Sequence, residues 1–261
     1  AHLPFALVNP GDAVLVPNPG YPVYETGTIL AGGEPVFMPL LAKNGFLPDL
    51  SDLPLGAKLM WLNYPNNPTT AYATAHFFGD AVEFAKDTGT VIAHDFCYAD
   101  VWERGSRLSM DWRGKSPISF LQIPGAKEVG IEFHSMSKTF NMTGWRLGFA
   151  VGNADIIEGL GRVKSNIDSG QFDVIQRAAL HALSLEWQEA ALASITVNNA
   201  LTNDRRRLIL ARLSSLGIKP AIEAKATFYL WLPTPHGMDS KKFVIEVLER
   251  SGVLFTPGTT F

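Results

Sequence analysis

The segment Ser135-Met136-Ser137-Lys138 combines residue types that could hold a phosphorylated aldehyde. In an extended segment the two serines point to the same side, and the lysine follows at the turn. Two hydroxyls and nearby backbone N–H groups suit a phosphate. A lysine amine shielded from water loses its proton more easily and can attack an aldehyde to form a Schiff base. Considered alone, the segment is more readily interpreted as a surface turn with a solvated lysine.

Asp95 ends an apolar segment, and Tyr98 follows three residues later. A carboxylate at such a place is costly to bury unless it meets a positive partner. A protonated pyridine nitrogen would be such a partner, and holding it protonated makes the ring an electron sink. The Tyr98 phenol could hydrogen-bond an oxygen on the same ring. The alternative is an aspartate that caps the following turn.

Two further motifs could contribute to the same site. Asn67 precedes Pro68, which favours an extended asparagine whose amide could donate to the ring oxygen. Arg146 lies between Gly144 and Gly148, where its guanidinium could form a forked contact with a phosphate. Considered alone, the asparagine motif is also typical of an ordinary turn, and the arginine could form an interior salt bridge.

Short apolar segments that favour β-strands position these motifs. Several are apolar on both faces, as in strands covered by helices on each side, and amphipathic patterns such as Ala75–Thr88 lie between them. The alternation predicts an α/β fold, a three-layer αβα sandwich around a mostly parallel sheet, with ligands beyond the carboxyl ends of the strands. The predicted strands are Ala13–Val16, Pro35–Leu40, Leu59–Asn63, Thr90–Asp95, Val129–His134 and Leu147–Gly152.

Helical patterns dominate the second half of the chain, and the longest spans roughly Trp187–Leu216. Beyond it, the sequence predicts a strand over Thr227–Leu232 and a helix over Ser240–Ser251. We therefore expect a large domain over residues 1–190, truncated at its N-terminus. Residues 191–261 are expected to form a connecting helix and part of a smaller C-terminal α/β domain.

Composition argues against several classes of protein. The 261 residues are 46% hydrophobic and 18% charged, enough to bury a substantial core. A net charge of -3 without long runs of one sign argues against nucleic acid as a partner, and no apolar run is long enough for a membrane span. The single cysteine, Cys97, fits a reducing compartment such as the cytoplasm. The histidines lack metal-ligand spacing, so no metal site is expected, and His94 and His134 are expected to be packed and hydrogen-bonded in the sheet.

Taken together, the order and spacing of these motifs resemble those of class I aminotransferases of fold type I, which use pyridoxal 5′-phosphate. The resemblance implies that Lys138 forms the Schiff base and moves a proton at the substrate α-carbon. It implies that Asp95 pairs with the pyridine nitrogen, while Tyr98 and Asn67 hold the phenolic oxygen. Asn67 is also expected to contact the substrate.

The same resemblance implies that the cofactor phosphate is bound by Ser135, Ser137 and Arg146. Tyr21 matches the aromatic residue that stacks on the cofactor ring in this family. Without the other motifs, Tyr21 would be interpreted as a tyrosine packed in a proline-rich turn. Members of the family form homodimers, so the same is expected here.

Three longer stretches, Val129–Phe149, Arg162–Gly170 and Lys225–Trp231, resemble the LL-diaminopimelate aminotransferase branch. That branch transfers an amino group between tetrahydrodipicolinate and glutamate in lysine biosynthesis. The residues by themselves predict only an aminotransferase that acts on an amino acid and a 2-oxo acid. An aspartate- or alanine-type aminotransferase, a lyase with the same cofactor, and a regulatory module that binds the cofactor without turnover remain alternatives.

The chain departs from the family pattern at Thr70, where glycine is usual. A β-branched residue is strained there if the position needs a positive φ. The chain is also expected to be a fragment that lacks the phosphate loop and the arginine that binds the substrate carboxylate. We therefore expect the full-length parent to be active and the 261-residue chain alone to be inactive.

Overall fold

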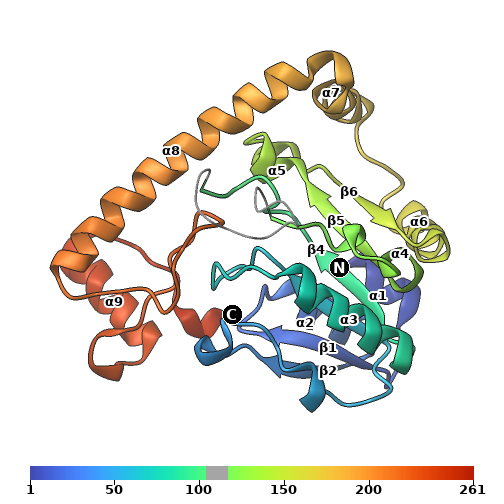
Figure 1. The fold of residues 1–261 in the computed structure, drawn as a ribbon, viewed down its shortest axis with the longest axis horizontal. Helices are drawn as coiled ribbons and strands as arrows, with labels where there is room; N and C mark the ends of the chain where they lie inside the picture. The colour runs from blue at the N-terminus through green and yellow to red at the C-terminus, as the bar shows by residue number, and fades with distance from the viewer. Residues whose placement is uncertain (104–116) are drawn as a thin grey trace.

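A computed structural model of the chain describes residues 1–103 and 117–261, and a six-stranded sheet forms its centre. The strand order is β2-β1-β3-β4-β5-β6; the first five strands are parallel and β6 is antiparallel to β5 (Figure 1). The strands are β1 (Ala13–Asn18), β2 (Glu34–Pro39), β3 (Leu59–Asn63), β4 (Val91–Asp95), β5 (Gly130–Ser135) and β6 (Gly148–Gly152). All six predicted strands are confirmed, with ends that differ from the prediction by at most two residues.

Helices connect and cover the strands. The helix predicted over Ala75–Thr88 is confirmed; Thr74 begins it by accepting a hydrogen bond from the Phe77 N–H, and Gly89 ends it with a φ of 73°. The helices are α1 (His2–Leu7), α2 (Val23–Leu30), α3 (Ala75–Thr88), α4 (Ala126–Val129), α5 (Met136–Thr139), α6 (Ala154–Ile167), α7 (Asp173–Leu183), α8 (Gln188–Ser215) and α9 (Ser240–Ser251). Among the described residues, none of these helices is long and apolar enough to cross a membrane.

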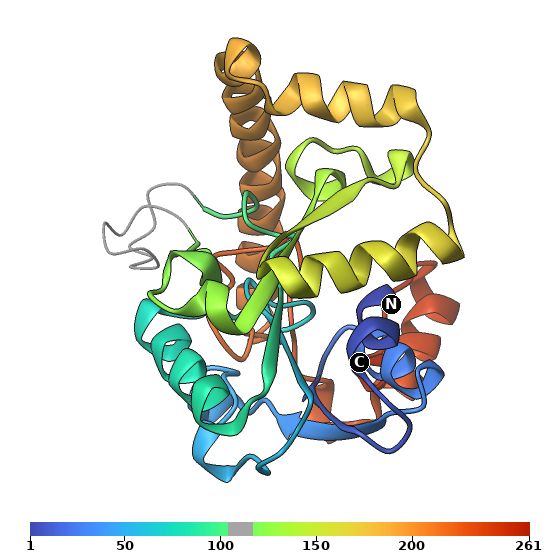
Figure 2. The same cartoon turned by 90° about the vertical axis from the view of Figure 1, so that its right-hand side faces the viewer.

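Two apolar cores lie on opposite faces of the sheet, because successive strand residues point to opposite sides. On one face, α3 packs Phe78 and Ala81 against Met60 and other strand residues. On the other face, α1, α2 and α6 contribute Leu3, Tyr24 and further side chains. Figure 2 shows the sheet between these two helical layers. The predicted three-layer αβα sandwich is therefore confirmed.

After α6 the chain leaves the sheet through α7 and the long helix α8, which leads to α9 (Figure 1). The predicted long helix and the helix Ser240–Ser251 are both confirmed. The predicted strand Thr227–Leu232 is wrong. This segment makes one isolated antiparallel bridge, between Trp102 and Ala226, and Thr227 then turns the chain with a φ of 59°, which is incompatible with an extended strand. The domain boundary at residue 190 remains a prediction.

Candidate functional site

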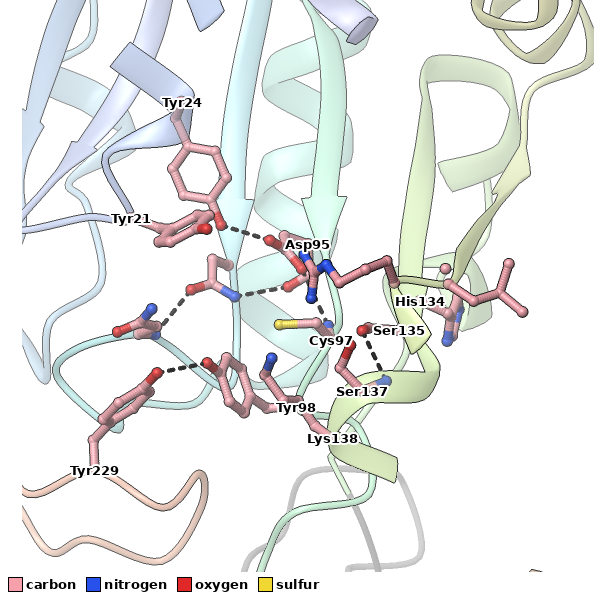
Figure 3. Close-up of a pocket in the computed structure, with 15 residues that line it drawn as sticks. Tyr21, Tyr24, Asp95, Cys97, Tyr98, His134, Ser135, Ser137, Lys138 and Tyr229 are labelled. Atoms are coloured by element: carbon pink, nitrogen blue, oxygen red, sulfur yellow. Dashed lines mark hydrogen bonds between the residues drawn. The ribbon is translucent and has the colours of Figure 1, made fainter. Parts of the chain in front are cut away.

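One pocket brings together all the residues that the sequence motifs predict for a site. It has a volume of ≈ 420 Å³, within the range of small-molecule sites, and lies at the carboxyl ends of β3, β4 and β5 (Figure 3). Its lining includes the eight predicted residues Tyr21, Asn67, Asp95, Tyr98, Ser135, Ser137, Lys138 and Arg146. The motifs thus converge from separate segments on one cavity.

Asn63 joins two of these segments. Asn63 and Asp95 are register partners at the ends of adjacent parallel strands. The Asn63 amide donates to the backbone oxygen of Asp95 at 2.8 Å, and its Oδ1 accepts from the Asn67 N–H at 2.8 Å. A single buried side chain therefore fixes the asparagine loop relative to the strand that carries the acid.

Two donors fix the Asp95 carboxylate. The Tyr24 hydroxyl donates to Oδ2 at 2.8 Å, and the Cys97 N–H donates to Oδ1 at 3.1 Å. Burial, reinforced by the charge of Asp95, raises the pKa of Tyr24 well above its usual value, so the phenol remains a donor. Tyr24 in turn stacks on Trp61 with ring centroids 4.9 Å apart, which holds the donor in place.

Lys138 enters the pocket from the short helix α5, which directly follows β5. The Ser135 side chain begins this helix by accepting from the Ser137 N–H at 3.2 Å. Thr139 donates to Asp100 Oδ2 at 2.8 Å and so ties α5 to the segment after Asp95. In Figure 3 the half-buried lysine extends toward Tyr98, with the two serines on the adjacent wall.

Arg146 lies at the mouth of the pocket in a left-handed conformation, with a φ of 55°. Its guanidinium donates to the Thr143 carbonyl at 2.9 Å. The interior salt bridge that was an alternative for this arginine is not found within residues 1–103 and 117–261. Gly148 follows, and a Cβ there would lie 2.6 Å from the His134 carbonyl, so only glycine allows β6 to approach β5 this closely.

Some pocket residues were not predicted from the sequence as site residues. They include Tyr24, Asn63, Cys97, His134 and Tyr229. Asn63 could have been found because it ends a strand next to that of Asp95. His134 and His94 are hydrogen-bonded to Glu132, as expected for sheet residues. Tyr229 lies in the stretch Lys225–Trp231 that carries part of the family resemblance, but nothing in that stretch marks it as a site residue, because it reaches the pocket from beyond α8.

Comparison with known proteins identifies the family. The family model described as aminotransferase class I and II matches residues 1–261, the whole chain. The chain belongs to this family. The LL-diaminopimelate aminotransferase of Syntrophobacter fumaroxidans is 48% identical over 265 residues, and that of Moorella thermoacetica is 50% identical over 268 residues. Each of these alignments covers 100% of this chain and 64% of the relative, so the chain spans about two thirds of their length.

Solved structures of other proteins share the fold. The substrate-bound structure of BacF from Bacillus subtilis superposes with a TM-score of 0.88 at 39% identity, covering 98% of this chain and 63% of that protein. A double mutant of Thermus thermophilus aspartate aminotransferase also has a TM-score of 0.88, at 28% identity, covering 99% of this chain and 65% of that protein. The fold-type expectation is therefore confirmed.

Enzymes of this family use pyridoxal phosphate, and the pocket of this chain fits that group. It offers an amine, a fixed carboxylate, two serine hydroxyls and a guanidinium, which match an aldehyde, a pyridine nitrogen and a phosphate. Asn67 is 7% exposed, and its buried Oδ1 has no hydrogen-bond partner among the described residues. The Oδ1 atom can only accept a hydrogen bond, so a contact to a phenolic oxygen would come from the Nδ2 of the same amide.

Proposed function

We propose that the full-length protein is a pyridoxal-phosphate-dependent amino-acid aminotransferase. The observation that carries the proposal is the meeting of Lys138 and Asp95 in one pocket, from segments that are separated in sequence and adjacent in the sheet. An amine and a fixed acid on opposite sides of a cavity suit a cofactor that must be both tethered and held protonated.

Each residue has a stated role in this proposal. Electron withdrawal from the substrate α-carbon is the chemistry that the bound cofactor supplies. The Lys138 amine tethers the cofactor and then takes and returns the proton at the α-carbon. Asp95 holds the proton on the pyridine nitrogen, because its carboxylate stabilises the positive ring.

The remaining residues bind and orient. Asn67 and Tyr98 hold the phenolic oxygen, and Asn67 also contacts the substrate. Tyr21, which is 43% exposed and lies edge-on to Tyr24, provides an aromatic surface for the cofactor ring. The phosphate is bound by Ser135, Ser137 and Arg146, which line one side of the pocket.

We further propose the substrate pair of the LL-diaminopimelate branch, in which an amino group passes between tetrahydrodipicolinate and glutamate. Support comes from the identity of 48% and 50% to relatives with that name, against 28% to the aspartate aminotransferase structure. We propose that the protein works in the cytoplasm, where its single cysteine stays reduced, and that it forms a homodimer.

Replacement of the lysine tests the function. In the full-length protein mixed with pyridoxal phosphate, Lys138→Ala should abolish the visible absorbance of the lysine-bound cofactor, whereas Lys127→Ala, at an exposed position, should retain it. Amino exchange between glutamate and a 2-oxo acid should fall by at least 10²- to 10⁴-fold, roughly the range for loss of a general acid–base group.

Borohydride reduction followed by peptide mass mapping locates the attachment point. The adduct should map to the peptide that carries Lys138 and disappear in Lys138→Ala. If Lys138→Ala keeps both the absorbance and amino exchange, the proposed role of Lys138 is wrong. If the wild-type protein binds the cofactor but exchanges no amino group with any amino acid tried, the regulatory alternative is favoured.

A further inference from the structure

We propose that Tyr229 is a positioning residue that donates a hydrogen bond to Tyr98 and thereby directs the Tyr98 hydroxyl at the phenolic oxygen of the cofactor. This inference rests on the proposed function and deepens it. It assigns a task in the cofactor site to the segment beyond α8, from which none of the predicted site residues comes.

The two tyrosines form a close pair across the pocket wall. Their hydroxyl oxygens are 2.9 Å apart, although the residues are 131 positions apart in sequence (Figure 3). The rings meet edge to face at a centroid distance of 5.8 Å, and Phe228 packs edge-on to Tyr98 at 5.5 Å. The Tyr98 ring is therefore held on one side by two aromatic residues of the same short segment.

The hydrogen bond between Tyr98 and Tyr229 uses only one of their two hydroxyl hydrogens. Burial raises the pKa of Tyr98 and of Tyr229, so both phenols keep their protons at neutral pH. A single hydrogen bond between them uses one of the two hydrogens, and neither hydroxyl has a second protein partner in the described part of the chain. The other hydrogen is available to an acceptor in the pocket.

Burial favours one direction for the shared hydrogen bond. Tyr98 is 3% exposed, whereas Tyr229 is half-buried, so Tyr229 can accept from water and Tyr98 cannot do so as easily. If Tyr229 donates, the Tyr98 hydrogen points to a ligand acceptor within the pocket. The opposite direction would leave the buried Tyr98 oxygen facing the phenolic oxygen without a hydrogen between them, which is unfavourable.

The segment that carries Tyr229 is fixed in position by backbone contacts. The Thr227 N–H donates to the Val101 carbonyl at 2.8 Å, and the Glu103 N–H donates to the Lys225 carbonyl at 2.8 Å. Thr227 has a φ of 59°, a conformation that a β-branched residue adopts only when its surroundings impose it. The Arg206 guanidinium imposes it in part by donating to the Thr227 carbonyl. The next turn brings Tyr229 to the pocket, with its N–H bound to Thr227 Oγ1 at 3.2 Å.

A directed Tyr98 hydroxyl has a measurable consequence. A hydrogen bond donated to the phenolate oxygen withdraws charge from it and weakens its attraction for the proton on the adjacent lysine-derived nitrogen. Without Tyr229, the Tyr98 hydroxyl can rotate away from the oxygen. The visible absorbance of the lysine-bound cofactor should then titrate at higher pH, and the cofactor should bind more weakly.

The test is a double-mutant cycle on the full-length protein loaded with pyridoxal phosphate. Tyr229→Phe should raise the midpoint of the absorbance titration by about half a unit or more and weaken cofactor binding about 2- to 10-fold, the range expected for one hydrogen bond. Tyr98→Phe should shift both quantities further in the same direction. Adding Tyr229→Phe to Tyr98→Phe should change neither, because the residue through which Tyr229 acts has lost its hydroxyl.

Tyr64→Phe is the matched control, since its buried hydroxyl donates to the Phe46 carbonyl outside the pocket. It removes one tyrosine hydroxyl hydrogen bond, as Tyr229→Phe does, and should leave the titration unchanged. The inference is overturned if Tyr229→Phe leaves the midpoint unchanged, or if its effect is the same in the Tyr98→Phe background. A wild-type protein that shows no visible absorbance with the cofactor contradicts the proposed function itself, which separates the two failures.

Discussion

Asp95 accepts one hydrogen bond at each carboxylate oxygen, and this arrangement determines what the carboxylate can bind. Tyr24 and the Cys97 N–H fix its orientation but leave lone pairs unused. A carboxylate held this way is preorganised for a cationic N–H donor rather than free to rotate toward water. Because both donors are neutral, the charge of Asp95 remains uncompensated by them and is available to a positive ring.

Thr70 occupies the position at which the family resemblance led us to expect glycine, and it has a positive φ of 66°, a conformation that favours glycine. Its N–H donates to the Asn66 carbonyl at 3.0 Å, so the turn is imposed by the surrounding loop. We predict that Thr70→Gly raises the free energy of unfolding above that of Thr70→Ala by about 1 kcal/mol, since only glycine avoids the left-handed penalty. Urea unfolding of the two variants checks this; equal midpoints would contradict it.

At the scale of single residues, the sequence was informative where several motifs occur together in one order. Considered alone, Ser135, Ser137 and Lys138 would be interpreted as a surface turn and Asp95 as a turn cap, so their assignment to one site depended on the order and spacing of all the motifs. Tyr229 could not be predicted, because its position depends on Thr227 adopting a left-handed conformation that no local residue pattern indicates. Its partner lies 131 residues away, and the pairing exists only after the chain has folded.

At the scale of elements, β4 and β5 are joined by a buried polar cluster beside the pocket. His94 donates to Glu132 Oε2 at 2.9 Å, and His134 donates to Oε1 at 2.8 Å. The Phe120 N–H and the Ser119 hydroxyl also donate to this carboxylate. Since His134 lines the pocket, the cluster links the wall of the site to the interior of the sheet.

This cluster predicts a defined loss of stability in acid. Burial alone would raise the pKa of Glu132, but the hydrogen bonds from His134 and His94 outweigh it and lower the pKa to about 2, against 4.5 for a free glutamate. A lowered folded-state pKa stabilises the protein above pH 4.5, and this stabilisation is lost as the pH falls toward 2. The contribution of Glu132 is on the order of 3 kcal/mol.

Unfolding of wild type and Glu132→Gln as a function of pH measures this contribution. The wild type should lose stability more steeply between pH 4.5 and pH 2 than Glu132→Gln, which has no carboxylate to protonate at that position. Glu34→Gln, at an exposed position, should follow the wild-type profile. Parallel profiles for all three proteins would mean that Glu132 has the same pKa in the folded and unfolded states.

The elements themselves were predictable to different degrees. Helix Ala75–Thr88 was predicted from its amphipathic pattern, and in the structure Thr74 and Gly89 cap it at those same ends. The apolar residues of Thr227–Leu232 fit the pattern of a strand equally well. In the structure, however, the start of this segment and the residues just before it form backbone hydrogen bonds with residues 101–103, and the segment pairs with no described strand along its length. Strand order was beyond reach, because it depends on which crossovers the helices make.

At the scale of the whole molecule, α8 leads the chain away from the sheet. The same helix also forms hydrogen bonds that hold the segment around Thr227 beside the pocket. Asn199 donates to the Asp100 carbonyl at 2.6 Å and accepts from the Trp102 N–H at 3.2 Å. About two turns further along the helix, the buried Arg206 holds the Thr227 carbonyl and Asn203. One face of a single helix thus contacts both chain segments that meet at the tyrosine pair.

This arrangement predicts that a substitution on α8 loosens the far side of the pocket without unfolding the sheet. Arg206→Met keeps much of the buried side-chain volume but leaves the Thr227 carbonyl unpaired, which should increase hydrogen exchange at the Thr227 and Tyr229 amides on the order of 10- to 100-fold. Amides of β3 should exchange as in the wild type, because the two apolar cores of the sheet do not include α8. Arg205→Met, at an exposed position on the same helix, should leave every one of these rates unchanged. Faster exchange in β3 as well would show that Arg206 stabilises the whole fold rather than only the segment around Thr227. Local unfolding of that segment exposes its own amides and leaves the amides of the sheet protected.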